Sequence, residues 1–438
     1  MQAGRTLWQS FFWRGLYYVC VFIINILIAR HFEASLSGSV YYLSSIYAFA
    51  VLLSSLSIES GIIYFSAKSQ IPIAGLFSFS LMWSLFTGLI TFLVVFIFFK
   101  NEFPRISRTL LMSSAVLYIS GNLLTTYCSG FFYANKDFIL PNLIIIAGTV
   151  ILIILIPYGG KSVIPVISND NYFYVYFGFF FVQGICMAIA AKFKYIKAGL
   201  FYFITLAQFR LLFRYCALAF TGNIIFFLLY RIDYFFVEKY CTAAELGNYI
   251  QVSKLVHLFF ILPTILASAV FPMSAGEQKD DINKLLSLLS RSIFSLYAIA
   301  CLVLSLTGKW LFPFIFGASF TSMYYPFLML IPGILALSGI FTLTAFFAGK
   351  NKIKINITAA VFALIVILTG DIIFIPQYGI VAAALVSSIG YIVYQIYIIT
   401  AFKKVYECNA ADFFIFRLSD WKRIKTSISA SLKLKNES

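Results

Sequence analysis

Long runs of apolar residues recur along the whole chain, and they constrain its fold more than any other feature. The hydrocarbon core of a bilayer is about 30 Å thick, and an α-helix needs about 20 apolar residues to cross it. The 438-residue sequence contains about twelve such runs, and no segment between them is long enough to form a separate soluble domain. Only 11% of the residues are charged, whereas soluble domains carry about 25%. The sequence therefore predicts a multi-pass membrane protein.

The predicted spans are helices. Transmembrane β-strands alternate apolar and polar residues over about ten positions, but segments 89–99 and 143–156 are apolar on every side. In the first half, the predicted spans are 10–30, 39–66, 73–99, 109–134, 138–157 and 171–191. In the second half, they are 213–238, 246–273, 290–316, 322–348, 354–375 and 379–402.

The distribution of Lys and Arg predicts the orientation. An even number of spans places both termini on the same side of the membrane. If that side is cytoplasmic, most of the 32 Lys and Arg residues face the cytoplasm, as the positive-inside rule expects. The net charge of +16 then reflects this topology and attraction to anionic lipid headgroups. It does not indicate nucleic-acid binding.

The second half of the chain repeats the plan of the first. A basic residue, a short polar loop and a glycine separate the first two spans of each half, at 30–41 (RHFEASLSGSVY) and 239–250 (KYCTAAELGNYI). The fifth spans end in related sequences, IPYGG at 156–160 and IPQYGI at 375–380. Six spans per repeat place both halves in the same direction, so a pseudo-two-fold axis would run along the membrane normal.

This repeat predicts two six-helix lobes and two smaller parts. The predicted parts are an N-terminal lobe (1–191), an interfacial cytoplasmic linker (192–212), a C-terminal lobe (213–402) and a basic cytoplasmic tail (403–438). Transporters with such repeats bind their substrates at the interface between the repeats. The plan therefore favours a transporter, although a scaffold protein built from duplicated helices is an alternative.

Ionisable residues within membrane spans are costly, and they usually line a cavity or form an ion pair. The candidate substrate-binding cations are Arg14, Arg210, Arg214, Arg231 and Lys254. The first three have an alternative role as snorkelling residues near headgroups. This excess of cations favours an anionic substrate, because Arg forms bidentate bonds to phosphate oxygens. The candidates for a coupling-ion site, or for structural ion pairs, are Glu59, Asp233, Asp371 and His257.

Features of an enzyme are sparse. The chain has two His, and its seven Cys are scattered without the paired spacing of a metal or redox site. We therefore expect no catalytic residue, no metal and no cofactor. An intramembrane glycan polymerase or acyltransferase is the enzymatic alternative. A polymerase would be expected to have a long external loop with basic catalytic residues, but the longest external connection, about 157–171, carries one Lys and one Asp.

Residues 230–275 resemble the seventh-to-eighth helix region of polysaccharide-biosynthesis flippases of the multidrug/oligosaccharidyl-lipid/polysaccharide exporter superfamily. The matching marks are R-x-D at 231–233, L-G-x-Y at 246–249 and F-P at 271–272. Segments 311–320 (LFPFIFGASF) and 375–388 (IPQYGIVAAALVSS) add support. The resemblance covers nearly the whole chain, and it specifies the superfamily better than the substrate.

The resemblance implies a two-lobed, multidrug-exporter-like bundle in the bacterial inner membrane. Such a protein would translocate an undecaprenyl-diphosphate-linked oligosaccharide, for O-antigen, lipopolysaccharide, capsule or a related glycan, by alternating access. Its implied cavity cations are Arg14, Arg231 and Lys254. Its implied partners are the lipid-linked oligosaccharide, membrane lipids, a glycan polymerase and a chain-length regulator. A cation-coupled small-molecule or drug antiporter of the same fold is the alternative, which the cationic cavity disfavours.

Overall fold

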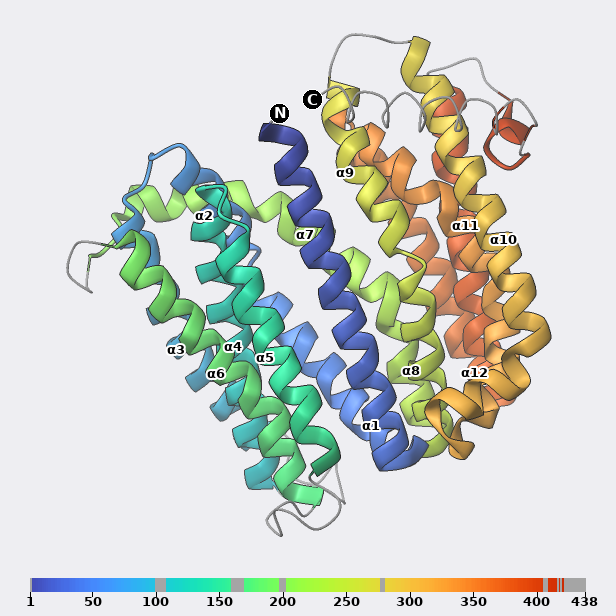
Figure 1. The fold of residues 1–438 in the computed structure, drawn as a ribbon, viewed down its shortest axis with the longest axis horizontal. Coiled ribbons are helices and arrows are strands. Elements are labelled where there is room, and N and C mark those ends of the chain that lie inside the picture. Colours follow the sequence, from blue (N-terminus) through green and yellow to red (C-terminus); the bar gives the residue numbers. More distant parts are fainter. Residues whose placement is uncertain are drawn as a thin grey trace, which may run out of the picture. The chain divides into compact units, whose positions relative to one another are not determined.

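The computed structural model describes residues 2–98, 108–158, 169–196, 202–275, 280–404, 409–415, 417 and 420. The regular structure of these residues is helical throughout, which confirms the predicted all-α class (Figure 1). The helices up to the middle of the chain are α1 (Gln2–Ser55), α2 (Ile58–Ala67), α3 (Ile73–Phe98), α4 (Arg108–Ala134), α5 (Ile139–Tyr158), α6 (Asn169–Tyr195) and α7 (Leu206–Tyr240). They are followed by α8 (Ala243–Leu258), α9 (Ile261–Ala275), α10 (Asp280–Phe316), η1 (Ala318–Met323), α11 (Tyr324–Gly349), α12 (Ile353–Lys403) and η2 (Ala410–Phe413).

Nine segments of the described chain are long and apolar enough to span a membrane. Two of these segments each contain two predicted spans. The α1 helix leaves helical geometry at Glu33, and α12 does so at Gly379, where φ is 59°. Glycine adopts this left-handed conformation without a steric penalty. With the shorter apolar helix α5, the twelve predicted spans are accounted for.

The second predicted span of each half is broken into two helices, a feature that the sequence analysis does not predict. Span 39–66 is interrupted at positions 56–57, between α1 and α2, and span 246–273 is interrupted at 259–260, between α8 and α9. Both residues of the first interruption have positive φ although neither is glycine. Such breaks are tolerated in a membrane only where neighbouring groups satisfy the freed backbone.

Side chains from neighbouring helices donate hydrogen bonds to backbone carbonyl oxygens at these breaks. The Tyr127 hydroxyl of α4 donates to the carbonyl oxygen of Ser55 at 3.0 Å, and Trp83 Nε1 of α3 donates to that of Ser54 at 2.7 Å. Tyr297 of α10 donates to a carbonyl oxygen at the second break. Contacts with other helices therefore stabilise the breaks in the two spans.

Helix contacts divide the chain into two units, Met1–Phe227 and Leu228–Ser438. The boundary lies inside α7, so the first half of this helix packs within the first unit and its second half within the second. Part of the predicted interfacial linker, 197–201, lies outside the described residues. Just after it, the Tyr202 amide donates to Ser78 Oγ of α3 at 3.1 Å. The assignment of 192–212 as a linker stays a prediction.

Close helix packing in the first unit depends on small residues. A Cβ atom at Gly121 of α4 would lie 2.3 Å from the carbonyl oxygen of Phe180, and one at Gly184 of α6 would lie 2.4 Å from the carbonyl oxygen of Gly121. The two backbones therefore touch at these positions. Helices in lipid associate largely through such packing, since there is no hydrophobic gain between them.

The turn between α4 and α5 carries a surface ion pair. Lys194 Nζ of α6 lies 2.6 Å from Asp137 Oδ2, with side chains 47% and 18% exposed. Desolvation raises the pKa of Asp137, but hydrogen bonding to Lys194 and the positive charge of that lysine outweigh it, so the pKa lies below its ordinary value. Exposed pairs of this kind contribute about 0–1 kcal/mol.

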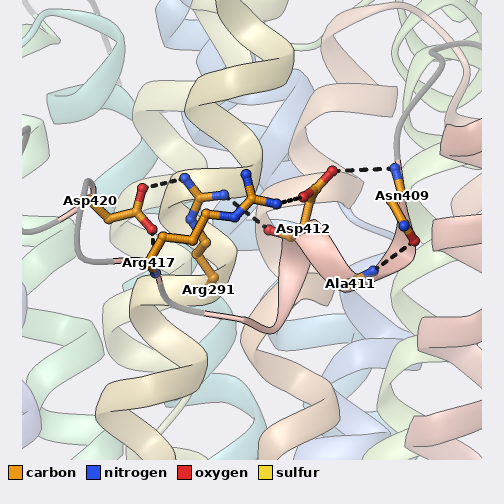
Figure 2. A network of polar contacts seen from close by, with 6 residues as sticks. All are labelled: Arg291, Asn409, Ala411, Asp412, Arg417 and Asp420. Atoms are coloured by element: carbon orange, nitrogen blue, oxygen red, sulfur yellow. Dashed lines mark hydrogen bonds and ion pairs between the residues drawn. The ribbon is translucent and has the colours of Figure 1, made fainter.

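A C-terminal segment packs against the second unit through a network of polar contacts (Figure 2). Arg291 of α10 forms a buried ion pair with Asp420 at 2.5 Å, with side chains 8% and 1% exposed. Arg417 forms a more exposed pair with Asp412. The Arg291 pair attaches the segment to α10, and the Arg417 pair lies within the segment.

Aromatic packing completes this attachment. Phe413 is buried and lies edge-to-face on Phe402 of α12, with ring centroids 5.6 Å apart. Phe414 contacts Phe294 of α10 in the same geometry at 5.3 Å. The first part of the predicted basic tail is thus a packed element, while 421–438 lies outside the described residues.

Candidate functional site

Two carboxylates from different helices lie buried in the second unit. Asp233 of α7 is 4% exposed and Asp371 of α12 is 0% exposed. The two carboxylates are close enough to repel each other electrostatically. Two uncompensated like charges in a low-dielectric interior are strongly unfavourable.

The hydrogen bonds of this pair are incomplete. The Tyr249 hydroxyl of α8 and Ser387 Oγ of α12 both donate to Asp233 Oδ2, the latter at 3.0 Å. Asp233 Oδ1 and both carboxylate oxygens of Asp371 have no hydrogen-bond partner in the described part of the chain. Buried acceptors without partners carry a desolvation cost. Three such oxygens on facing helices suit a proton or a small cation.

Two sharp turns bring these side chains together. Thr242 and Glu245 form a capping box at the start of α8: the Thr242 hydroxyl accepts from the Glu245 amide at 3.3 Å, and Glu245 Oε2 accepts from the Thr242 amide at 2.8 Å. This motif fixes the start of the helix and sets α8 against α7. The turn at Gly379 lies between Asp371 and Ser387.

A group of basic residues lies on α7 and α8. Arg231 of α7 and Lys254 of α8 are half-buried and close enough to interact electrostatically with each other and with His257. Lys254 and His257 lie one turn apart near the C-terminal end of α8. The structure therefore brings together three residues that the sequence analysis selected separately.

Aromatic rings surround this cationic group. The His257 ring lies 5.0 Å from Phe260 and 6.1 Å from Tyr230, and Tyr230 lies 5.7 Å from Tyr391. Tyr391 also interacts electrostatically with both buried carboxylates. The cationic group and the carboxylate pair are thus neighbouring parts of one site in the second unit.

The other selected residues lie elsewhere. Glu59 is half-buried in the first turn of α2, and its Oε2 has no hydrogen-bond partner among the described residues. Arg210 and Arg214 are exposed on the first half of α7. Arg14 belongs to α1, but its side chain lies outside the described residues. The described residues contain no group of three or more His, Cys, Asp or Glu that could hold a metal ion.

Sequence reasoning missed two members of the site, Tyr249 and Ser387. Both lie in segments that carry the family resemblance, L-G-x-Y at 246–249 and the stretch ending in two serines at 387–388. Uncharged hydroxyl groups do not stand out in a membrane span, because Ser and Tyr are common there for packing and interfacial reasons. Only their position beside Asp233 identifies them.

Solved structures match the chain over nearly its whole length. No known family model and no curated protein sequence matches it. The inward closed conformation of the lipid II flippase MurJ matches with a TM-score of 0.69 and 17% identity, over 92% of this chain and 88% of that one. An inward-facing multidrug resistance MATE family transporter of the MOP superfamily matches with a TM-score of 0.69 and 12% identity, over 86% and 92%.

A third match is a MOP superfamily transporter from Pyrococcus furiosus, with a TM-score of 0.62 and 12% identity over 92% of this chain and 94% of that one. At these identities the likeness establishes the fold alone. It confirms the predicted 12-helix, two-lobe architecture. The chain therefore has the same fold as these solved transporters.

Proposed function

We propose that the chain is a flippase that moves an undecaprenyl-diphosphate-linked oligosaccharide across the bacterial inner membrane. The observation that carries this proposal is the pair of half-buried cations, Arg231 and Lys254, on neighbouring membrane-spanning helices. A diphosphate cannot enter hydrocarbon without replacement of its hydration. Charge-assisted hydrogen bonds from Arg and Lys supply that replacement. The lipid II flippase among the structural neighbours supports a lipid-bearing substrate.

The proposed mechanism is alternating access without catalysis. The diphosphate binds the cations, the glycan occupies hydrated space, and the polyprenyl tail stays in lipid. The carboxylate pair Asp233–Asp371 binds the coupling cation, a proton or sodium, and links its gradient to transport. Both termini lie in the cytoplasm in this proposal. A glycan polymerase and a chain-length regulator are the partners that the family resemblance implies.

A small-molecule antiporter is the second candidate function. The buried carboxylate pair favours it, because a cationic compound and a proton can compete for the same acidic oxygens. Multidrug resistance transporters are also among the structural neighbours. The cations Arg231 and Lys254 beside that pair argue against a cationic cargo, which they would repel.

Deletion of the gene in its host tests the proposal. We expect one complete polyprenyl-diphosphate-linked repeat unit to accumulate, measured by mass spectrometry, and surface polysaccharide to be lost. Expression of the wild-type chain restores both. Unchanged lipid-linked glycans with increased sensitivity to small toxic compounds would instead support the antiporter.

Alanine substitution of the cations gives a sharper prediction. Arg231→Ala and Lys254→Ala should each lower surface polysaccharide at least about tenfold at equal protein level, since each removes a charged hydrogen bond worth about 1.5–3 kcal/mol. Arg231→Lys should restore part of the activity, because it keeps the charge and loses the guanidinium fork. Lys309→Ala, which removes an exposed lysine near the end of α10, is the control. Normal polymer from both alanine variants would refute the assignment.

A further inference from the structure

The first half of α7 packs on α2 through one narrow stripe of residues. Leu212 and Cys216, one turn apart, are 1% and 0% exposed. Several large side chains beside them are exposed, among them Leu206, Leu211 and Phe213. Ring contacts of Phe209 with Phe79 of α3 and of Phe227 with Phe49 of α1 complete the packing of this half of the helix in the first unit.

Gly61 of α2 lies directly against Leu212 and Cys216 of α7. A Cβ atom at this position would lie 2.4 Å from Leu212 Cδ1 and 2.8 Å from Cys216 Sγ. A larger residue would have to displace the α7 side chains. The α7 side chains therefore fill the space that a side chain at position 61 would occupy.

Two contacts flank this point. The rings of Tyr64 and Tyr215 stack with centroids 4.5 Å apart and planes at 21°. Further along, Asn223 Nδ2 donates to Ser57 Oγ at 3.0 Å, and Ser57 is one of the positive-φ residues where α1 ends and α2 begins. We refer to these residues, with Gly61, Leu212 and Cys216, as the α2–α7 contact.

The second half of the same helix is fastened in the second unit. Leu229 and Val237 are buried there, and Asp233 accepts hydrogen bonds from α8 and α12. The helix runs without interruption over 35 residues, which corresponds to about 50 Å. One continuous helix thus joins the α2–α7 contact to the carboxylate pair.

We propose that the α2–α7 contact is a gate that separates and re-forms during transport, with α7 connecting it to the cation site. The proposal rests on the transport function proposed above. The contact suits a reversible role because its members are uncharged: it consists of apolar and aromatic packing and one neutral hydrogen bond, from Asn223 to Ser57, and contains no ion pair. Helix contacts built on small residues depend on packing rather than on buried charge, so separation of these residues breaks no ion pair.

A disulfide across the contact tests this proposal in the intact protein. Gly61→Cys places a thiol beside the native Cys216, since the S–S bond of about 2 Å brings the Cβ of one cysteine to about 3 Å from the other sulfur. We expect oxidation to join the two positions, identified by mass spectrometry of the linked peptides. Transport should fall at least tenfold on oxidation and recover on reduction with dithiothreitol.

Two variants control for effects other than the cross-link. Gly61→Ala adds the same Cβ without a thiol, and Gly61→Cys combined with Cys216→Ser cannot form the disulfide. Both should transport equally well before and after oxidation. Efficient cross-linking with undiminished transport would refute the gate, and failure of a folded Gly61→Cys protein to cross-link would refute the contact itself.

Reactivity of Cys216 gives a test that needs no change at Gly61. In a variant whose other cysteines are replaced by serine, N-ethylmaleimide should modify Cys216 slowly at rest and several-fold faster when a proton or sodium gradient is applied. A slow rate under all conditions would contradict opening of the contact. If labelling and cross-linking behave as expected while the deletion strain shows no lipid-linked glycan, the gate stands and the proposed substrate is wrong.

Discussion

Replacing Asp371 with asparagine is expected to abolish coupled transport while leaving the protein at least as stable as the wild type. The carboxylate is fully buried, and neither of its oxygens has a hydrogen-bond partner among the described residues. Asparagine has nearly the same shape and no charge, so it removes repulsion with Asp233. We expect transport to fall at least about tenfold, as for loss of a coupling free energy of about 1.4 kcal/mol. The measurements are gradient-driven flux in proteoliposomes and the thermal unfolding midpoint in detergent.

The combination of the two readouts separates a coupling role from a structural one. A carboxylate that only stabilises the fold would lower the unfolding midpoint when neutralised. Asp137→Asn is the matched control, because it makes the same chemical change at the exposed pair with Lys194. It should leave the flux unchanged, and it should alter the free energy of unfolding by no more than about 1 kcal/mol. Normal flux with a lowered midpoint for Asp371→Asn would contradict the coupling role.

Comparison of the wild type with Asp371→Asn also identifies the coupling ion. A ligand that binds only the folded state stabilises it by about 2.7 kcal/mol at 100 times its dissociation constant. If sodium is the ion, sodium chloride should raise the unfolding midpoint of the wild type more than potassium chloride does. Asp371→Asn should remove that difference. Equal midpoints in both salts, with flux that follows a pH gradient, would identify the proton.

The helical plan was predictable because lipid imposes it. Apolar runs of sufficient length locate the spans, and the polar landmarks at 30–41 and 239–250 mark the turns that the structure shows at Glu33 and around Thr242. The breaks at 56–57 and 259–260 were not predictable. The first lies in a serine-rich stretch, 54–60 (SSLSIES), inside a longer apolar run, and the second falls on two phenylalanines, 259–260. Helical spacing alone marks neither position, and Tyr127, Trp83 and Tyr297 from other helices satisfy the backbone there.

The candidate site shows the same limit. Charged residues in spans are rare, so Arg231, Lys254, Asp233 and Asp371 could be selected by composition alone. Their grouping could not, because helical spacing relates residues only within one helix. Asp233 and Asp371 come from α7 and α12, and they meet only through the packing of those helices.

The C-terminal attachment was missed for a related reason. Arg291 and Asp420 are 129 positions apart, and in sequence each resembles an ordinary residue of a solvated cytoplasmic segment. Burial makes this pair different from a surface ion pair, because removal of one partner leaves the other charge uncompensated. The energetic importance of a charge depends on how much of it is buried, which the local sequence does not record.

Asp420→Asn is therefore expected to release the C-terminal segment and destabilise the second unit. Loss of one partner of a buried ion pair costs about 3–5 kcal/mol. The lower end, about 3 kcal/mol, applies here because a released segment lets Arg291 reach water. The expected results are a lower thermal unfolding midpoint in detergent and rapid proteolytic cleavage between the end of α12 and position 420, at a protease concentration that leaves the wild type intact.

Two further variants define the cause. Arg417→Ala removes only the exposed pair with Asp412, whose side chains are 57% and 27% exposed, and should cost no more than about 1 kcal/mol. Replacing both Arg291 and Asp420 with leucine removes both charges together, so it should recover much of the stability lost in Asp420→Asn, as buried ion pairs replaced by apolar residues often do. If Asp420→Asn melts and resists proteolysis like the wild type, the pair does not hold the segment, and the aromatic contacts of Phe413 and Phe414 suffice.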